Sequence, residues 1–151
     1  MELKHHVVVS TVISGILYAV FRSWGLTIAS FISGIFIDLD HVIDYVMEHG
    51  FHFDRKHFFG FFYGEKYKRI TLIFHGWEWL AVLIFFAWWT DWNPWFTGML
   101  IGCGQHMAAD RFYNISTFMT YSLLWRWKKG FDPEKFLLKN RDRKRVKMYN
   151  E

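Results

Sequence analysis

The sequence predicts an all-α membrane protein: a four-helix transmembrane bundle followed by a C-terminal segment that lies on the membrane surface. The chain has 151 residues, of which 52% are hydrophobic and 22% aromatic, and this composition excludes a disordered chain. Four long apolar runs precede residue 114, which would leave too little polar surface for a soluble monomer. Aspartate and histidine residues interrupt these runs. Ionisable side chains at membrane depth are costly, and they indicate a functional site.

The first two helices are expected close together at the N-terminal end. Val7–Phe21 is uncharged and lacks a small-residue cleavage site, so it is interpreted as a span and not as a signal peptide. A short turn at residues 22–25 follows. Leu26–Met47 is then the second predicted helix. It contains the sequence Ile35-Phe36-Ile37-Asp38-Leu39-Asp40-His41, where charge enters an apolar run abruptly.

The second pair of helices follows a charged and aromatic loop, Glu48–Arg69. Ile70–Thr90 is the third apolar run, and a turn at residues 91–94 leads to the fourth helix, Trp95–Tyr113. Pro94 suits the first turn of that helix, because proline lacks the N–H group that helix starts leave unpaired. Each run approaches the roughly 17–25 residues that a membrane span requires, provided that its ionisable positions are included.

The distribution of lysine and arginine predicts the topology. Nearly all of them lie near the N-terminus, in the long loop or in the C-terminal tail, while the two short turns hold only Arg22. The positive-inside rule then places both termini and the long loop in the cytoplasm. Five tryptophans would form an aromatic belt at the outer face: Trp24, Trp88, Trp89, Trp92 and Trp95.

The chain changes character after Asn114, which divides it into a bundle (residues 1–114) and a membrane-surface tail (residues 115–151). Ile115–Trp127 is aromatic and is expected to form an interfacial helix, and Asp132–Glu151 is strongly basic. The expected partners are the lipid bilayer and, for the tail, anionic headgroups. A nucleic-acid or protein contact is the less favoured alternative.

The ionisable residues of the four runs are predicted to share one layer. Measured along ideal helices from the two outer turns, they lie roughly 18–25 Å inward, near the cytoplasmic edge. Small or polar residues recur at every fourth position before several of them, as in Gly98-Gly102-His106-Asp110, Ser30-Gly34-Asp38 and His6-Ser10-Ser14. Residues four apart lie on nearly one helix face, and small residues allow close helix contact. These stripes therefore bring the polar residues into the bundle interior.

Histidine with carboxylate and no thiolate indicates a site for a divalent metal. Zinc is expected first, with manganese or iron as alternatives, bound as one or two ions. The single cysteine, Cys103, excludes a cysteine-based zinc site. The candidate ligands are His6, Asp38, Asp40, His41, His75, His106 and Asp110. They exceed what one tetrahedral ion needs, so two ions share the site or some of the residues orient ligands.

Three points stay open at this level. His5 could replace His6, although only His6 begins a stripe. On an ideal helix Asp38 lies nearly opposite Asp40, so either the helix loosens there or only some of these residues are ligands. A general base is also needed for hydrolysis, and the candidates are Glu78, one turn from His75, and Asp40. A role for Glu78 in pairing helices or orienting a ligand is the alternative.

Four features occur together in this chain: an N-terminal His before a small-residue helix, the sequence Asp38-Leu39-Asp40-His41, the mid-chain His75, and His106-x-x-x-Asp110. In this combination the chain resembles a family of small bacterial inner-membrane proteins designated membrane-bound metal-dependent hydrolases. The resemblance covers residues 1–114 and implies a multi-pass protein of the bacterial inner membrane with the seven ligands above. The chain departs from the usual pattern at Ile37, where members have Pro, and at Gly76, where they have Arg.

The expected function is hydrolysis of a phospholipid or another membrane-associated phosphoester at the cytoplasmic face. The alternative is a metal-binding or metal-transport membrane protein without turnover. A transporter should carry polar residues on both sides of the membrane midplane, whereas here the outer half is almost wholly apolar.

Overall fold

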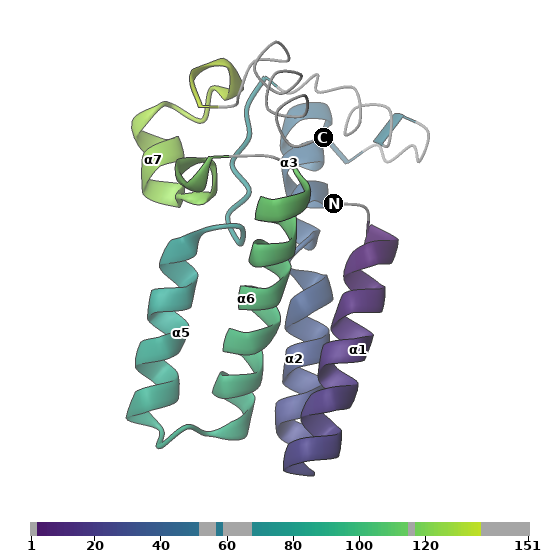
Figure 1. Cartoon of the computed structure of the whole chain (residues 1–151). Helices are drawn as coiled ribbons and strands as arrows, with labels where there is room; N and C mark the ends of the chain where they lie inside the picture. Colours follow the sequence, from purple (N-terminus) through teal and green to yellow (C-terminus); the bar gives the residue numbers. More distant parts are fainter. Residues whose placement is uncertain (1–2, 52–56, 59–67, 115–116, 137–151) are drawn as a thin grey trace, which may run out of the picture.

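The computed structural model describes residues 3–51, 57–58, 68–114 and 117–136, and every regular element within these ranges is helical. Its elements are α1 (Leu3–Phe21), α2 (Trp24–Phe36), α3 (Leu39–His49), α5 (Trp77–Trp89), α6 (Pro94–Tyr113), η1 (Phe118–Tyr121), α7 (Leu123–Lys128) and η2 (Pro133–Lys135). Helices α1, α2, α5 and α6 run side by side, with the α1–α2 and α5–α6 turns at one end (Figure 1). Helices α3 and α7 lie toward the other end. The prediction of an all-α fold is confirmed.

The two turns form where the sequence predicts them, and both begin a helix with a capping side chain. Ser23 accepts a hydrogen bond from the Leu26 N–H at the start of α2, and Asn93 accepts one from Trp95 N at the start of α6, where Pro94 occupies the first turn. Such caps satisfy the backbone donors that a helix start leaves free. The connections are short, so the helices they join are antiparallel neighbours.

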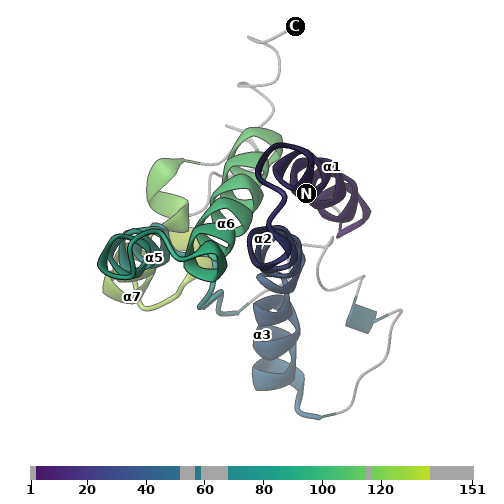
Figure 2. The ribbon, with the colours of Figure 1, turned by 90° about the horizontal axis from the view of Figure 1, so that it is seen from below.

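Helix α6 is the centre of the bundle, because it packs against α1, α2 and α5. Viewed from below, it lies between α5 and α2, with α1 on the far side of α2 (Figure 2). A side chain at Gly98 would collide with the backbone carbonyl of Leu26, and one at Gly102 with that of Ser30. The predicted stripes therefore are the helix contacts. On α1 the buried residues are His6, Ser10 and Ser14.

The second helix loosens at Asp38, which is one of the two alternatives left open there, and the predicted start of the third helix is wrong. The second helix is interrupted at Ile37–Asp38, which separates α2 from α3, and the third begins at Trp77 and not at Ile70. The carboxylate of Asp44 accepts hydrogen bonds from the N–H groups of Thr71 and Leu72. Asp40 accepts them from Phe74 and His75. These side-chain bonds replace the backbone bonds that a helix over residues 70–76 would form.

Among the residues that the structure describes, two helical stretches are long and apolar enough to cross a membrane by length and composition: Leu3–Phe21 and Trp24–His49, the second counted through its interruption. Helix α5 is apolar but shorter. Helix α6 has the length, but it carries the polar residues of the bundle interior.

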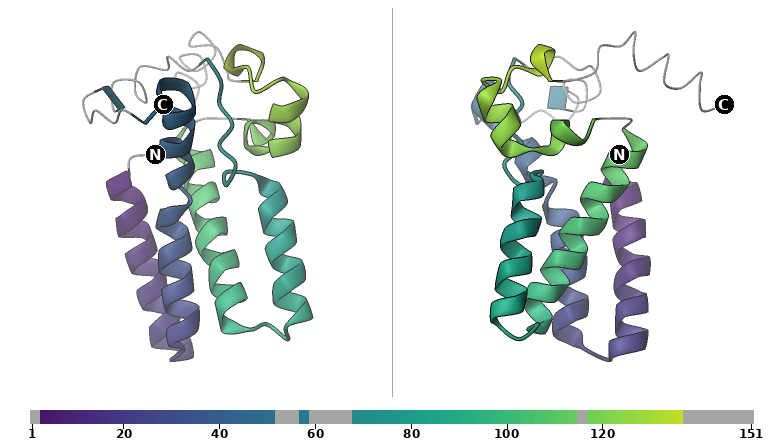
Figure 3. Two further views of the ribbon diagram at one scale, coloured as in Figure 1. Left: turned by 180° about the vertical axis from the view of Figure 1, so that it is seen from behind. Right: turned by 60° about the vertical axis from the view of Figure 1, so that its left-hand side comes forward.

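The described part of the C-terminal segment folds back on the bundle, across the end of α5 (Figure 3). The Trp77 indole donates a hydrogen bond to the carbonyl of Phe118, and the Ile70 N–H donates one to Phe131. The expectation of one interfacial helix over Ile115–Trp127 is wrong, since η1 and α7 are separated by Ser122. Most of the basic stretch Asp132–Glu151 lies outside the described residues.

Candidate metal centre

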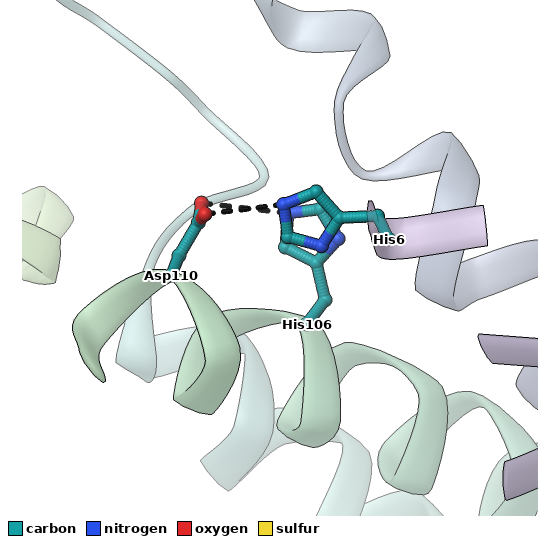
Figure 4. Close-up of side chains that lie close together, drawn as sticks. All are labelled: His6, His106 and Asp110. Carbon is teal, nitrogen blue, oxygen red and sulfur yellow. Dashed lines mark hydrogen bonds and ion pairs between the residues drawn. The ribbon is translucent and has the colours of Figure 1, made fainter. Parts of the chain in front are cut away.

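Side chains from separate parts of the chain converge beside the interruption between α2 and α3. His6 comes from α1, Asp38 from the interruption itself, His75 from the segment before α5, and His106 and Asp110 from α6. Figure 4 shows three of them, with His6 and His106 lying against each other and facing Asp110. The sequence prediction of one polar layer is confirmed for these five residues.

Four atoms that could be metal ligands lie close together. The Nε2 atoms of His75 and His106 are 3.0 Å apart. Asp38 Oδ1 lies 3.5 Å from the first and 3.4 Å from the second. Asp110 Oδ2 lies 3.5 Å from His75 Nε2 and 3.6 Å from His106 Nε2. Ligands about 2.0–2.2 Å from a tetrahedral zinc ion are themselves about 3.3–3.6 Å apart. The four N···O distances fall in this range, and the distance between the two Nε2 atoms is shorter.

The hydrogen bonds of the two imidazoles place a proton on the Nδ1 atom of each ring. His106 Nδ1 lies 2.8 Å from the carbonyl oxygen of Gly34, which can only accept, so this nitrogen carries the proton. His75 Nδ1 lies 2.9 Å from the carboxylate of Asp40 and donates to it. With a second proton on Nε2, each ring would donate to the carboxylates of Asp38 and Asp110. With Nε2 unprotonated, the two nitrogens and the two carboxylates could together bind a metal ion.

His6 belongs to this cluster, and His5 does not. The His6 ring stacks on His106 with 3.7 Å between ring centroids, and its Nε2 lies 3.1 Å from Asp110 Oδ1. The His5 ring lies instead beside Tyr113, at 5.8 Å. The structure thus decides between the two histidines in favour of the one that begins the stripe.

The cluster is open on one side only. The side chains of His6, His75, His106 and Asp110 are 5% exposed or less, while those of Asp38 and His41 are 16% and 24% exposed. His41 Nε2 lies 3.5 Å from Asp38 Oδ1. The potential ligands fall into two groups of three, one formed by His6, His106 and Asp110 and the other by Asp38, His41 and His75. A reactant would reach the second group first.

Asp40 is placed differently from the prediction. Its carboxylate is fully buried and already accepts bonds from the N–H groups of Phe74 and His75 and from the His75 ring. These contacts orient His75, as an outer carboxylate does for a ligating histidine. They leave Asp40 poorly placed to be a ligand or to take a proton from a reactant.

Glu78 is also placed differently, because its carboxylate caps α7. It accepts hydrogen bonds from the Ser122 hydroxyl at 2.6 Å and from the N–H groups of Leu123 and Leu124 at 2.9 and 3.1 Å. A carboxylate at a helix N-terminus with three donors is a stable structural arrangement. The contacts favour the alternative role in pairing helices over that of general base.

The sequence does not predict the role of Arg126, which holds the backbone of the segment that carries His75. It is 1% exposed, and its Nη2 donates to the carbonyls of Leu72 and His75 at 2.9 and 2.8 Å. Burial lowers the pKa of Arg126, and the nearby carboxylates of Asp40 and Glu78 oppose that effect. Its one sequence signal is a charge between apolar residues in Leu123-Leu124-Trp125-Arg126-Trp127.

The fold and the site together define an all-helical protein with a buried His/Asp cluster that could hold a divalent metal ion. No family model matches the chain, and neither the curated proteins nor the solved structures contain a match to it. The function is therefore argued from the site itself.

Proposed function

We propose that this protein is a membrane-embedded, metal-dependent hydrolase that acts on a phospholipid or another membrane-associated phosphoester at the cytoplasmic face. The observation that carries this proposal is the pair of neighbouring three-residue groups, one of His6, His106 and Asp110 and the other of Asp38, His41 and His75, in each of which the potential ligand atoms lie within 4.8 Å of one another. Buried charged groups are stable where they are paired or bind a metal ion.

The outer surface of the bundle supports a membrane location. Large apolar side chains point outward along the helices, as at Val12 (55% exposed) and Ile16 (57%) on α1 and at Ile84 (50%) and Phe85 (50%) on α5. In water, an apolar surface of this extent would favour aggregation. In this proposal α1, α2 with α3, α5 and α6 all cross the bilayer, with α6 sheltered by the others.

The ends of the bundle support the proposed orientation. All five tryptophans of the predicted belt are more than half exposed, and they belong to the residues at or next to the two tight turns. Tryptophan is enriched at membrane interfaces. The non-helical residues 70–75 lie at the opposite end. The N–H groups of Thr71 and Leu72 are paired with Asp44, and those of Phe74 and His75 with Asp40. Non-helical backbone at membrane depth requires such pairing.

The number of ions bound decides between catalysis and simple binding. Two ions, each held by one group of three residues, would each keep a free coordination position, as catalytic zinc sites do. An ion in such a site polarises a phosphoryl oxygen and makes water a nucleophile near neutral pH. Asp38 and His41, the most exposed members, would meet the phosphoester.

A metal-binding protein without turnover is the second candidate, and one observation favours it. Four potential ligand atoms lie close together, from His75, His106, Asp38 and Asp110. A single ion held by all four would have a closed tetrahedral shell, which is typical of structural zinc.

The test combines metal analysis with a search for lipid products. Purified protein should contain two divalent ions per chain, and incubation with a bacterial lipid extract should give new products by mass spectrometry. Asp38→Asn should lose both properties, whereas the control Asp132→Asn, at an exposed carboxylate far along the chain, should keep them. One ion per chain with identical lipid profiles for all three proteins would reject hydrolysis and favour the second candidate. Absence of bound metal would reject both.

A further inference from the structure

An apolar groove opens beside the candidate metal centre, on the outside of the bundle. It has a volume of about 340 Å³ and runs between α2 and α5, with Cys103 of α6 at its floor. Helix α6 packs against both α2 and α5, and these two lie on either side of it (Figure 2). The groove is the gap that α6 leaves between its two neighbours.

The inner end of the groove is next to the metal donors in the chain. Its lining includes Ile37 and Leu39, the residues on either side of Asp38, and Phe74, which precedes His75. Asp38 is also one of the two exposed members of the donor cluster. A molecule that lies in the groove therefore contacts the chain neighbours of Asp38 and His75.

The chemistry of the lining selects a hydrocarbon. Apolar side chains dominate it, and the hydroxyl of Ser33 is occupied by the backbone carbonyl of Ala29 at 2.7 Å. A polar ligand would find few partners there. The outer part of the lining is exposed on the same surface that the bilayer would cover, with Phe36 at 54% and Trp79 at 38% exposure.

We propose that the groove between α2 and α5 binds one fatty acyl chain of a membrane lipid and thereby places the lipid's phosphoester beside Asp38 and His41. This inference rests on the proposed function, and it adds that the substrate is a lipid with at least one long chain that reaches the site laterally from the bilayer. A groove of this volume lies within the range of about 300–1,000 Å³ in which small-molecule sites fall.

The test measures occupancy of the groove without turnover. A phosphatidylglycerol with a photoreactive diazirine near the end of one acyl chain is mixed into vesicles of phosphatidylethanolamine and phosphatidylglycerol that contain the protein, and labelled residues are located by mass spectrometry. Labelling should concentrate at Trp79, Leu83 and Cys103. It should exceed that of Val12 and Ile16, which face ordinary surrounding lipid, and it should decrease when unlabelled long-chain lipid is added in excess.

A matched pair of variants separates the groove from the rest of the surface. Leu83→Trp fills the groove, and Ile84→Trp adds the same side chain to the outward face of α5. Labelling of Cys103 should fall several-fold in Leu83→Trp and stay unchanged in Ile84→Trp, with equal metal content in both. Reaction of Cys103, the chain's only cysteine, with a bulky maleimide in the folded wild-type protein should likewise lower the labelling of Trp79 and Leu83.

Failure of the groove and failure of the hydrolase proposal give different results. The groove residues could be labelled no more than Val12 and Ile16, with no change on Leu83→Trp or on reaction with the maleimide. This result would overturn the proposed acyl-chain site even if the wild type releases lipid products. Concentrated, variant-sensitive labelling that persists after the metal is removed would support the groove even if no lipid product forms.

Discussion

The guanidinium of Arg126 donates a hydrogen bond of 2.8 Å to the main-chain carbonyl of His75. The same nitrogen donates to the carbonyl of Leu72 at 2.9 Å. Asp40 and Asp44 hold the N–H groups of the same segment. A residue from the C-terminal segment therefore helps to fix a candidate metal ligand, although it lies beyond the helices that contain the other ligands.

Replacing Arg126 by leucine should destabilise the protein and loosen the site. The carbonyls of Leu72 and His75 would lose their buried donor, and each unpaired group costs about 1–3 kcal/mol. We expect the free energy of unfolding to fall by about 2–4 kcal/mol and the metal content to drop. Denaturation in detergent and metal analysis measure the two effects. Lys128→Leu, at an exposed position on the same helix, is the control, and an equal effect there would contradict the role assigned to Arg126.

Replacing Glu78 by glutamine should weaken the fold more than the site. If Glu78 caps α7, the loss is about 0.5–2 kcal/mol, as for other helix caps, and the metal content stays unchanged. Ser122→Ala should cost a similar amount, and the double variant should lose less than the sum of the two, because both changes remove the bond between the two side chains. The remaining losses add, because Ser122 also accepts from Trp125 N and Glu78 from the N–H groups of Leu123 and Leu124. Fully additive losses in a double-mutant cycle would contradict the contact. A fall in turnover with no change in stability would restore Glu78 as a candidate general base.

The two adjacent histidines of α1 provide a matched test of the site. His6→Ala should release metal, because its Nε2 atom faces Asp110 inside the cluster. His5→Ala should retain the metal, because that ring lies against Tyr113. Metal content per chain, measured on both purified variants, distinguishes them. Equal retention would remove His6 from the ligand set.

The proposed topology predicts which positions are reached from outside the cell. A single cysteine at position 92, in the turn between α5 and α6, should react with an impermeant thiol reagent in intact cells, and one at position 68 should react only after lysis. Both cysteines are introduced into Cys103→Ser. The reverse pattern would invert the orientation, and labelling of both positions in intact cells would rule out the arrangement of four spans.

Removal of residues 137–151 should weaken binding to anionic vesicles and leave the metal content unchanged. The segment carries six basic residues, Lys139, Arg141, Arg143, Lys144, Arg145 and Lys147, and lies outside the candidate ligand set. Each basic residue near an anionic surface contributes about 1 kcal/mol to binding. Flotation with phosphatidylglycerol vesicles at low and high salt measures the change. A loss of metal on truncation would show that the tail takes part in the site.

The sequence by itself determined the helical class, the positions of the two turns and most of the site. These follow from local rules: apolar runs of helical length, Pro94 in the first turn of a helix, and a spacing of four residues in the stripes. Because residues four apart share a helix face, the stripe that begins at His6 and the one that ends at Asp110 could be assigned to the interior without knowing their partners.

Tertiary structure alone decided which carboxylates face the centre and which support it. Asp38, Asp40 and Asp44 are carboxylates within seven residues of one another, and the sequence predicts the first two as ligands. The interruption at Ile37–Asp38 turns Asp38 toward His75 and His106, while Asp40 and Asp44 bond to the backbone of a segment about thirty residues later in the chain. Those bonds depend on where that segment lies in space. The same is true of Glu78, whose donors are more than forty residues away, and of Arg126. The hydrogen-bond partners of Asp40, Asp44, Glu78 and Arg126 are distant in sequence, and no local pattern identifies them.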